Sequence, residues 1–166
     1  MYYTAYVAWL TAEHASLTFE PGVVEVGPSH SPTRPPAAPP WNMDWLIRFP
    51  DGMQAYIYER WFPMKGSSRI GERGAFSFHY GTVTPLVRRN GFPARDKVNH
   101  PAHIRIDLDH NGPHLHFHAE LPHIGQDKVQ GMSIENVDPF DFVRAVQEHR
   151  ATKADFDSIM KFTVLP

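Results

Sequence analysis

Residues 103–120 alternate polar and apolar side chains on both sides of an Asn-Gly pair, and no other feature of the chain constrains its fold as strongly. The first flank reads HIRIDLD and the second reads HLHFHAE. A period of two is typical of a β-strand with one buried face, and Asn-Gly favours a tight hairpin turn. The segment therefore predicts two antiparallel strands that share one apolar face and one polar face.

The register of this hairpin follows from its turn. A tight turn at Asn111-Gly112 would need Pro113 to donate the closing hydrogen bond, which proline cannot do, so a four-residue loop at 110–113 is favoured. Both loops pair Asp109 with His114, and a loop one residue longer or shorter would set apolar side chains opposite histidines. The expected cross-strand pairs are Asp107 with His116, Arg105 with His118, His103 with Glu120, Ile106 with Phe117 and Leu108 with Leu115.

Histidine is in excess in this chain and is concentrated around the hairpin. Seven of the 11 histidines lie between His100 and His123. Solvated strand faces mostly carry Lys, Glu, Thr and Ser, so a face with four histidines predicts a functional surface. His110 is expected to be only a turn residue, whereas His79 is a further candidate because its strand could lie beside the hairpin. The candidate catalytic residues are His116, His114, His118, Arg105, Asp107 and His103.

The favoured chemistry for this face is acid–base catalysis without a metal. The pKa of an unperturbed imidazole, about 6.5, suits proton transfer at neutral pH. An opposite carboxylate such as Asp107 would fix one tautomer and raise the imidazole pKa, and Arg105 would hold an anion, most naturally a phosphate. Together these groups suit metal-free RNA cleavage, in which the 2′-hydroxyl attacks the adjacent phosphate.

Metal binding is the alternative chemistry. His114, His116 and Glu120 are spaced to lie on one face of one strand, with His103 or Asp107 across from them. That spacing resembles the first motif of cupins, which bind iron, manganese or zinc through such ligands. The cofactor would then be a divalent transition metal, whereas the favoured interpretation expects none. A non-catalytic binding protein, such as a phage or defence accessory, is a third possibility.

Composition limits the classes of protein to which the chain can belong. There is no cysteine, which excludes disulfides and thiolate zinc sites. The formal net charge of −2 argues against strong sequence-independent binding of nucleic acid. A local basic patch, or protonated histidines, would still be compatible with this net charge. No apolar run approaches the ~20 residues that span a bilayer, and residues 1–10 lack the basic start of a signal peptide. We expect a cytoplasmic protein without a membrane partner.

Elsewhere the chain predicts strands first and helices last. Its 166 residues suit a single domain, 1–166, with a Pro-rich loop at about 27–40 that cannot join a sheet ladder. Asp138-Pro139 and the Thr152–Asp155 pattern predict the starts of two C-terminal helices. The expected fold class is α+β, a mostly antiparallel β-sheet with C-terminal helices packed on one face. Strands are expected at 1–10, 16–20, 23–26, 44–49, 53–60, 75–81 and 82–87, and loops at 65–74 and 88–99.

Five short stretches between Trp45 and Arg150 carry a family resemblance. They are Phe49-Pro50-Asp51-Gly52, Phe76-Ser77-Phe78-His79-Tyr80, Arg88-Arg89-Asn90, Pro113-His114-Leu115-His116 and the segment Phe140 to Arg150. In this order they resemble the TumE family of prokaryotic toxin–antitoxin proteins, although the arginine stretch lacks the Tyr-Asp of the family pattern.

This resemblance implies a toxin acting against RNA, with a cognate antitoxin-like protein as its partner. Carried over residue by residue, it points to His114 and His116, and after them to His79 and Arg89. The function expected from the sequence is therefore that of a TumE-like toxin, a metal-independent endoribonuclease and thus a hydrolase.

Overall fold

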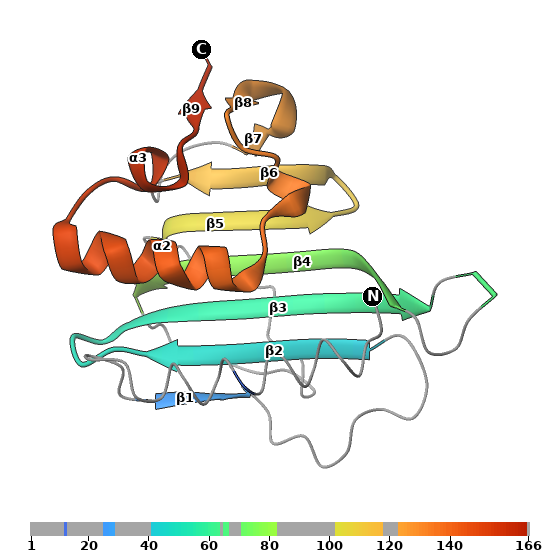
Figure 1. The fold of residues 1–166 in the computed structure, drawn as a ribbon, viewed down its shortest axis with the longest axis horizontal. Helices are drawn as coiled ribbons and strands as arrows, with labels where there is room; N and C mark the ends of the chain where they lie inside the picture. The colour runs from blue at the N-terminus through green and yellow to red at the C-terminus, as the bar shows by residue number, and fades with distance from the viewer. Residues whose placement is uncertain are drawn as a thin grey trace.

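The protein is an α+β fold built on a mostly antiparallel sheet, seen here in a computed structural model (Figure 1). The parts of the chain that the structure describes are Ala12 and residues 25–28, 41–63, 65–66, 71–82, 102–117 and 123–165. Within them, the side chains of 25–28, 41–44, 71, 82, 102, 103 and 117 lie outside the description.

Seven strands form one antiparallel sheet within the described residues, and their order in space follows their order in the chain. They are β1 (Glu25–Pro28), β2 (Trp41–Arg48), β3 (Met53–Pro63), β4 (Gly71–Thr82), β5 (Ala102–Asp109), β6 (Gly112–Phe117) and β7 (Ile124–Gly125). A separate pair is formed by β8 (Val129–Gln130) and β9 (Thr163–Val164).

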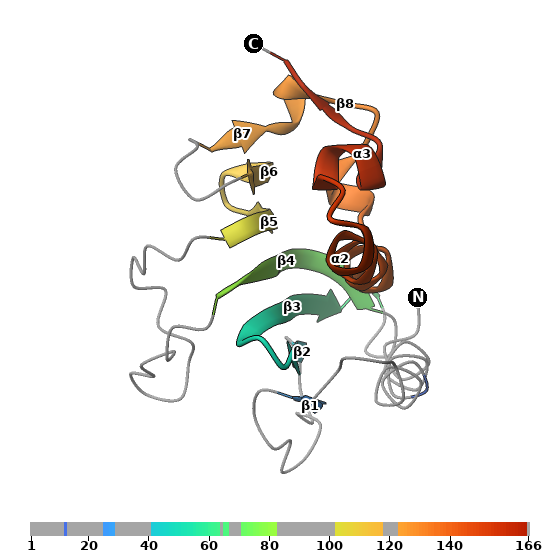
Figure 2. The same cartoon turned by 90° about the vertical axis from the view of Figure 1, so that its left-hand side faces the viewer.

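Two helices cover one face of the sheet, as Figure 2 shows. They are α2 (Pro139–Thr152) and α3 (Phe156–Met160), and the short 3-10 turns η1 (Gln126–Lys128) and η2 (Ile134–Asn136) precede them. The expected N-cap of α2 is confirmed, because the carboxylate of Asp138 accepts from the backbone N–H groups of Phe140 and Asp141, each at 2.8 Å. This cap and the proline in the first turn fix the point where the chain turns back across the sheet.

The core lies between α2 and the apolar face of the sheet, which faces this helix. The rings of Phe78 and Phe142 lie 5.6 Å apart between centroids, and Ile104, Ile106 and Leu115 are fully buried. Because successive side chains of a strand point to opposite faces, Arg105, Asp107, His114 and His116 face away from this core. The helices thus leave the polar face of the hairpin on the other side of the sheet.

Most of the strands expected from the sequence are confirmed where the structure describes them. Residues 44–49 and 53–60 correspond to β2 and β3, 75–81 lie within β4, and the hairpin corresponds to β5 and β6. Residues 1–10, 16–20, 83–87 and 88–99 fall outside the described residues, as do 23–24 and 29–40.

Three local predictions are wrong. Gly71–Gly74 were expected in a loop but begin β4, where Arg73 pairs with Trp61 of β3. Gly27 and Pro28 were expected to stay out of the sheet but pair with β2, which an edge strand such as β1 allows for proline. The expected capping box at Thr152 is absent, because Thr152 still belongs to α2, Lys153 follows in the left-handed conformation at φ 62°, and α3 starts after Asp155.

Candidate functional site

The hairpin β5–β6 has the expected faces but not the expected register. Asp107 pairs with His114 and Arg105 pairs with His116, so each pairing between Ile104 and Asp109 is shifted by two residues from the one expected, and Glu120, the expected partner of His103, lies outside the described residues. The predicted pairs of Asp107 with His116 and of Arg105 with His118 are therefore wrong, as are those of Asp109 with His114, Ile106 with Phe117 and Leu108 with Leu115. Because side chains alternate with a period of two, a shift of two residues keeps each side chain on its expected face.

The side chain of Asp109 accounts for the shifted register. Its Oδ1 accepts a 2.7 Å hydrogen bond from the backbone N–H of Asn111, which is the local bond that aspartate favours in turns. The turn residues are His110 and Asn111, and Gly112 follows in the left-handed conformation at φ 83°. A left-handed glycine after the turn closes the hairpin with Asp109 opposite Gly112 rather than opposite His114.

Two rows of polar side chains cross the face opposite the helices. One row runs from Ser77 of β4 through Asp107 to His114, and the other runs from His79 through Arg105 to His116. The expectation that the strand of His79 lies beside the hairpin is confirmed. β4 thus widens the candidate site by two polar positions, of which Ser77 was not singled out from the sequence.

Asp107 lies at the centre of this face and is almost completely buried, with 1% of its surface exposed. Its Oδ2 lies 2.7 Å from Nε of Arg105, 3.4 Å from Nε2 of His114 and 3.8 Å from Nε2 of His116. Among the described residues, no donor makes a well-directed hydrogen bond to this oxygen. Three positively charged or protonatable groups therefore converge on one buried carboxylate oxygen.

His114 is held by the backbone of its own strand. Its Nδ1 lies 2.8 Å from the carbonyl oxygen of Gly112, a contact in which the ring nitrogen donates. A carbonyl cannot donate, so this contact places a proton on Nδ1 and turns Nε2 toward Asp107. The side chain is only 4% exposed, which makes it a positioned group rather than one that a large substrate can touch.

His123 completes a cluster of three histidines that the hairpin pattern alone does not predict. It directly precedes β7, which pairs with β6 through His114 and Gly125. The centroid of its ring lies 3.6 Å from that of His114 and 5.0 Å from that of His116. The concentration of histidines up to His123 is the one sequence signal that could have identified it.

The electrostatics of the cluster differ from residue to residue. Burial opposes ionisation of Asp107, but the contact with His114 and the charge of Arg105 outweigh it and keep its pKa below the ordinary 3.8. Burial also disfavours the charged form of His114, yet Asp107 raises its pKa above 6.5. Burial and the charge of Arg105 lower the pKa of His116, so the rise expected from an opposite carboxylate occurs at His114 instead.

His123 shows the same pattern as His116. The pKa of its imidazole lies below 6.5, mainly because of burial and secondly because of the charge of the neighbouring His114. Two imidazoles that favour the neutral form thus lie beside one that favours the protonated form. Neutral imidazoles carry the free lone pair that a general base or a metal ligand needs.

Of the candidate residues named from the sequence, the structure brings together Arg105, Asp107, His114 and His116. His103 lies in β5, but its side chain is outside the description, and the backbone pairing described ends at Ile104 with Phe117. His118, Glu120 and Arg89 lie outside the described residues.

Comparison with models of protein families, with curated proteins and with solved structures finds no match to this chain. Within the described residues, no helix is both long enough and apolar enough to cross a membrane.

Proposed function

We propose that this protein is a TumE-like cytoplasmic toxin that cleaves RNA on the polar face of β4, β5 and β6, with an antitoxin-like protein as its partner. The observation that carries the proposal is the cross-strand pair of Arg105 and His116 beside Asp107. The two side chains are 46% and 33% exposed, so a substrate can reach both. A guanidinium next to an accessible imidazole is the combination that phosphodiester cleavage needs.

In the proposed reaction, the 2′-hydroxyl oxygen attacks the adjacent phosphorus, and the bond from phosphorus to the 5′-oxygen breaks. The histidine cluster takes up the hydroxyl proton, and the departing 5′-oxygen receives a proton from solvent water. The products are a 2′,3′-cyclic phosphate end and a 5′-hydroxyl end. Arg105 offers fixed positive charge to the phosphate oxygens, where negative charge increases in the transition state.

Burial divides the roles among the polar side chains. Asp107 and His114 are nearly inaccessible, so they position the groups that substrate can touch rather than touching it themselves. The carboxylate of Asp107 orients the imidazole of His116 and the guanidinium of Arg105 from beneath. Arg105 and His116 are therefore the proposed contact residues, and Asp107 and His114 the proposed positioning residues.

The proposal is tested by incubating a mixed RNA pool with the wild type and with single variants. His116→Ala should reduce the cleavage rate by roughly 10²–10⁴-fold, the usual contribution of a placed proton-transfer group. Arg105→Ala should reduce it by roughly 10²–10³-fold through lost charge stabilisation. His110→Ala is the matched control, because this histidine of the same hairpin has a side chain that is 77% exposed.

Analysis of the RNA ends adds a second readout, since the proposed reaction requires cyclic phosphate termini. Cleavage that both variants perform at the wild-type rate would overturn the proposal, and so would a wild type without any activity toward RNA. In the second case the same face would be assigned to partner binding instead.

A further inference from the structure

We propose that His114, His116 and His123 bind one divalent transition-metal ion of the zinc type beside the buried carboxylate of Asp107. The proposal departs from the metal-free chemistry that the sequence favours, and it replaces Glu120 with His123 among the ligands. Binding of the ion stands on the geometry of the cluster alone. Only its role in cleavage rests on the function proposed above.

Two of the three imidazoles come from β6, and the third comes from the residue that directly precedes β7. His114 and His116 occupy alternate positions of β6 and share a face, while His123 approaches from the start of β7. One ring nitrogen of each lies within 4.8 Å of the others. Zinc–nitrogen bonds of about 2.0–2.1 Å place tetrahedral ligand atoms about 3.4 Å apart, so only a small closure of the rings is needed.

His114 has the hydrogen bond expected of a metal-binding histidine. Imidazoles that ligate through one nitrogen usually donate from the other to a carboxylate or a backbone carbonyl, which fixes the tautomer. Nδ1 of His114 is 2.8 Å from the Gly112 carbonyl, so Nε2 is the nitrogen available to an ion. Nε2 also faces Oδ2 of Asp107 at 3.4 Å, the distance expected between two atoms that bind the same ion.

The buried Oδ2 of Asp107 supports a metal ion at this place independently of the three imidazoles. It is an almost fully buried carboxylate oxygen without a well-directed hydrogen bond from any described residue. Such an oxygen costs free energy unless positive charge satisfies it, and without an ion the half-exposed guanidinium of Arg105 is the nearest such charge, 2.7 Å away. A divalent ion among the three imidazoles would add positive charge on the buried side, with Asp107 as a neighbouring carboxylate that helps to neutralise it.

Arg105 connects this ion to the proposed function. Its Nε lies 2.7 Å from the same Asp107 oxygen, and its half-exposed side chain is able to turn toward solvent. An ion that neutralises Asp107 would release Arg105 to hold a substrate phosphate. The bound ion itself would supply Lewis acidity to a phosphate oxygen. Because the ion would occupy the lone pairs of the three imidazoles, these histidines would accept the hydroxyl proton only in the ion-free protein, and in the loaded protein solvent would take it up.

The test uses the full chain without a histidine tag, stripped with a chelator, dialysed, and titrated with zinc chloride in a calorimeter without RNA. We expect one zinc ion per chain. His123→Ala should weaken binding by at least about 100-fold, since loss of even an outer-shell partner typically costs 10–100-fold. This exposed histidine is chosen so that the variant keeps its fold. His110→Ala serves as the control and should bind zinc as the wild type does.

Asp107→Asn keeps the shape of the side chain and removes its charge, so we expect zinc affinity to fall by about 10–100-fold. Absence of saturable zinc binding would overturn the proposal, and so would equal zinc affinity of the wild type and His123→Ala. Zinc binding without RNA cleavage would leave the metal site standing and remove the proposed function. Cleavage by a zinc-free protein that a chelator does not slow would retain the function and remove the role of the ion in it.

Discussion

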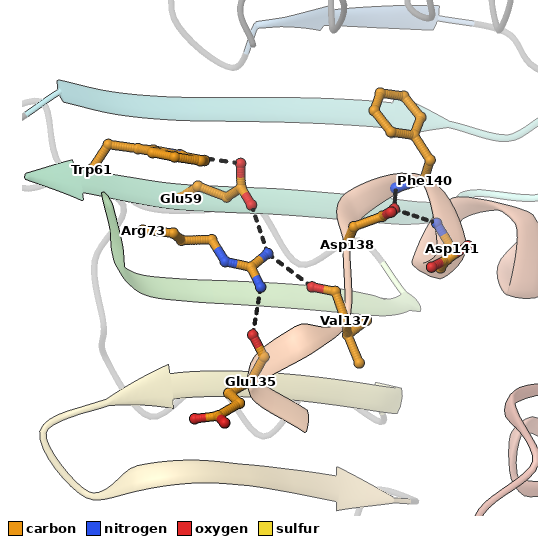
Figure 3. Close-up of polar contacts among 8 residues, drawn as sticks. All are labelled: Glu59, Trp61, Arg73, Glu135, Val137, Asp138, Phe140 and Asp141. Carbon is orange, nitrogen blue, oxygen red and sulfur yellow. Dashed lines mark hydrogen bonds and ion pairs between the residues drawn. The ribbon is translucent and has the colours of Figure 1, made fainter. Parts of the chain in front are cut away.

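Among the side chains that the structure describes, each face of the sheet buries one carboxylate, and the two carboxylates differ in how fully they are hydrogen-bonded. On the helix side, Glu59 of β3 is fully buried and lies 3.1 Å from the Nη1 of Arg73, while Nε1 of Trp61 donates to its other oxygen at 3.4 Å (Figure 3). On the open side, Asp107 is just as buried, but its Oδ2 lacks a well-directed hydrogen bond from the described residues.

Arg73 makes the helix-side network complete. Its guanidinium donates to the carbonyl oxygens of Val137 at 2.8 Å and Glu135 at 2.5 Å, and it lies 4.4 Å above the ring of Phe76. These bonds tie the segment before α2 to the sheet. A carboxylate whose partners are all fixed serves the fold, whereas one that is surrounded by imidazoles and left incompletely bonded is available to a ligand. We therefore assign a structural role to Glu59, and the proposed metal site assigns a binding role to Asp107.

Removing the cation on the helix side should give the largest loss of stability. Arg73→Met leaves Glu59 charged, buried and without its main partner, and we expect the free energy of unfolding to fall by about 3–5 kcal/mol. Arg105→Met makes the same change on the open face, where the guanidinium is half exposed and the imidazole of His114 remains 3.4 Å from Oδ2 of Asp107, and should cost less, about 1 kcal/mol. Denaturant unfolding of both variants measures the two losses, and equal losses would contradict the comparison.

Much of this architecture follows from local sequence rules. The period-two alternation places β2, β3, β5 and β6, and Asp138 with the following proline sets the start of α2, because these signals act within a few residues. Which side chains of the hairpin share a face is also predictable, since only registers that differ by an even number of residues bury all its apolar side chains together. The two-residue shift is not predictable in this way, because the expected and the observed register place the same side chains on each face. The hydrogen bond from Asn111 to Asp109 decides between them.

The site was less predictable than the fold. His114, His116, Arg105 and Asp107 share a face because of strand alternation, which the sequence displays directly. His123 joins them only through the pairing of β7 with β6, and no periodicity links it to the hairpin. The start of β4 was missed for a related reason, since its glycines resemble a loop and its extension depends on pairing with β3.

Zinc should stabilise the protein, and the gain should depend on the open face alone. An ion that binds only the folded state at 100 times its Kd adds about 2.7 kcal/mol to the free energy of unfolding. We expect this gain for the wild type and for Arg73→Met, provided that this variant remains folded, because Arg73 lies on the other face. His123→Ala should gain almost nothing. Thermal unfolding with and without zinc measures the effect, and an equal gain in His123→Ala would place the ion elsewhere.

A third carboxylate, that of Asp51 in the turn between β2 and β3, is exposed, so its contribution to stability can be compared with those of the buried Glu59 and Asp107. Its side chain is 53% exposed, and Oδ2 lies 2.9 Å from Nη1 of Arg150 in α2. Partial burial works against ionisation, but the hydrogen bond from Arg150 and that from the backbone of Met53 leave the pKa of Asp51 below its ordinary 3.8.

Asp51→Asn should therefore give the smallest effect of the series. A solvent-exposed ion pair contributes at most about 1 kcal/mol, and we expect a loss of that size or less at neutral pH. Because folding lowers the pKa of this carboxyl, its contribution is complete above the ordinary pKa of 3.8 and is lost as the pH falls through the lower folded value. Unfolding curves of the wild type and the variant should thus converge in acid. A difference that persists unchanged below that range would show that geometry at the turn, and not the charge of Asp51, sets its contribution.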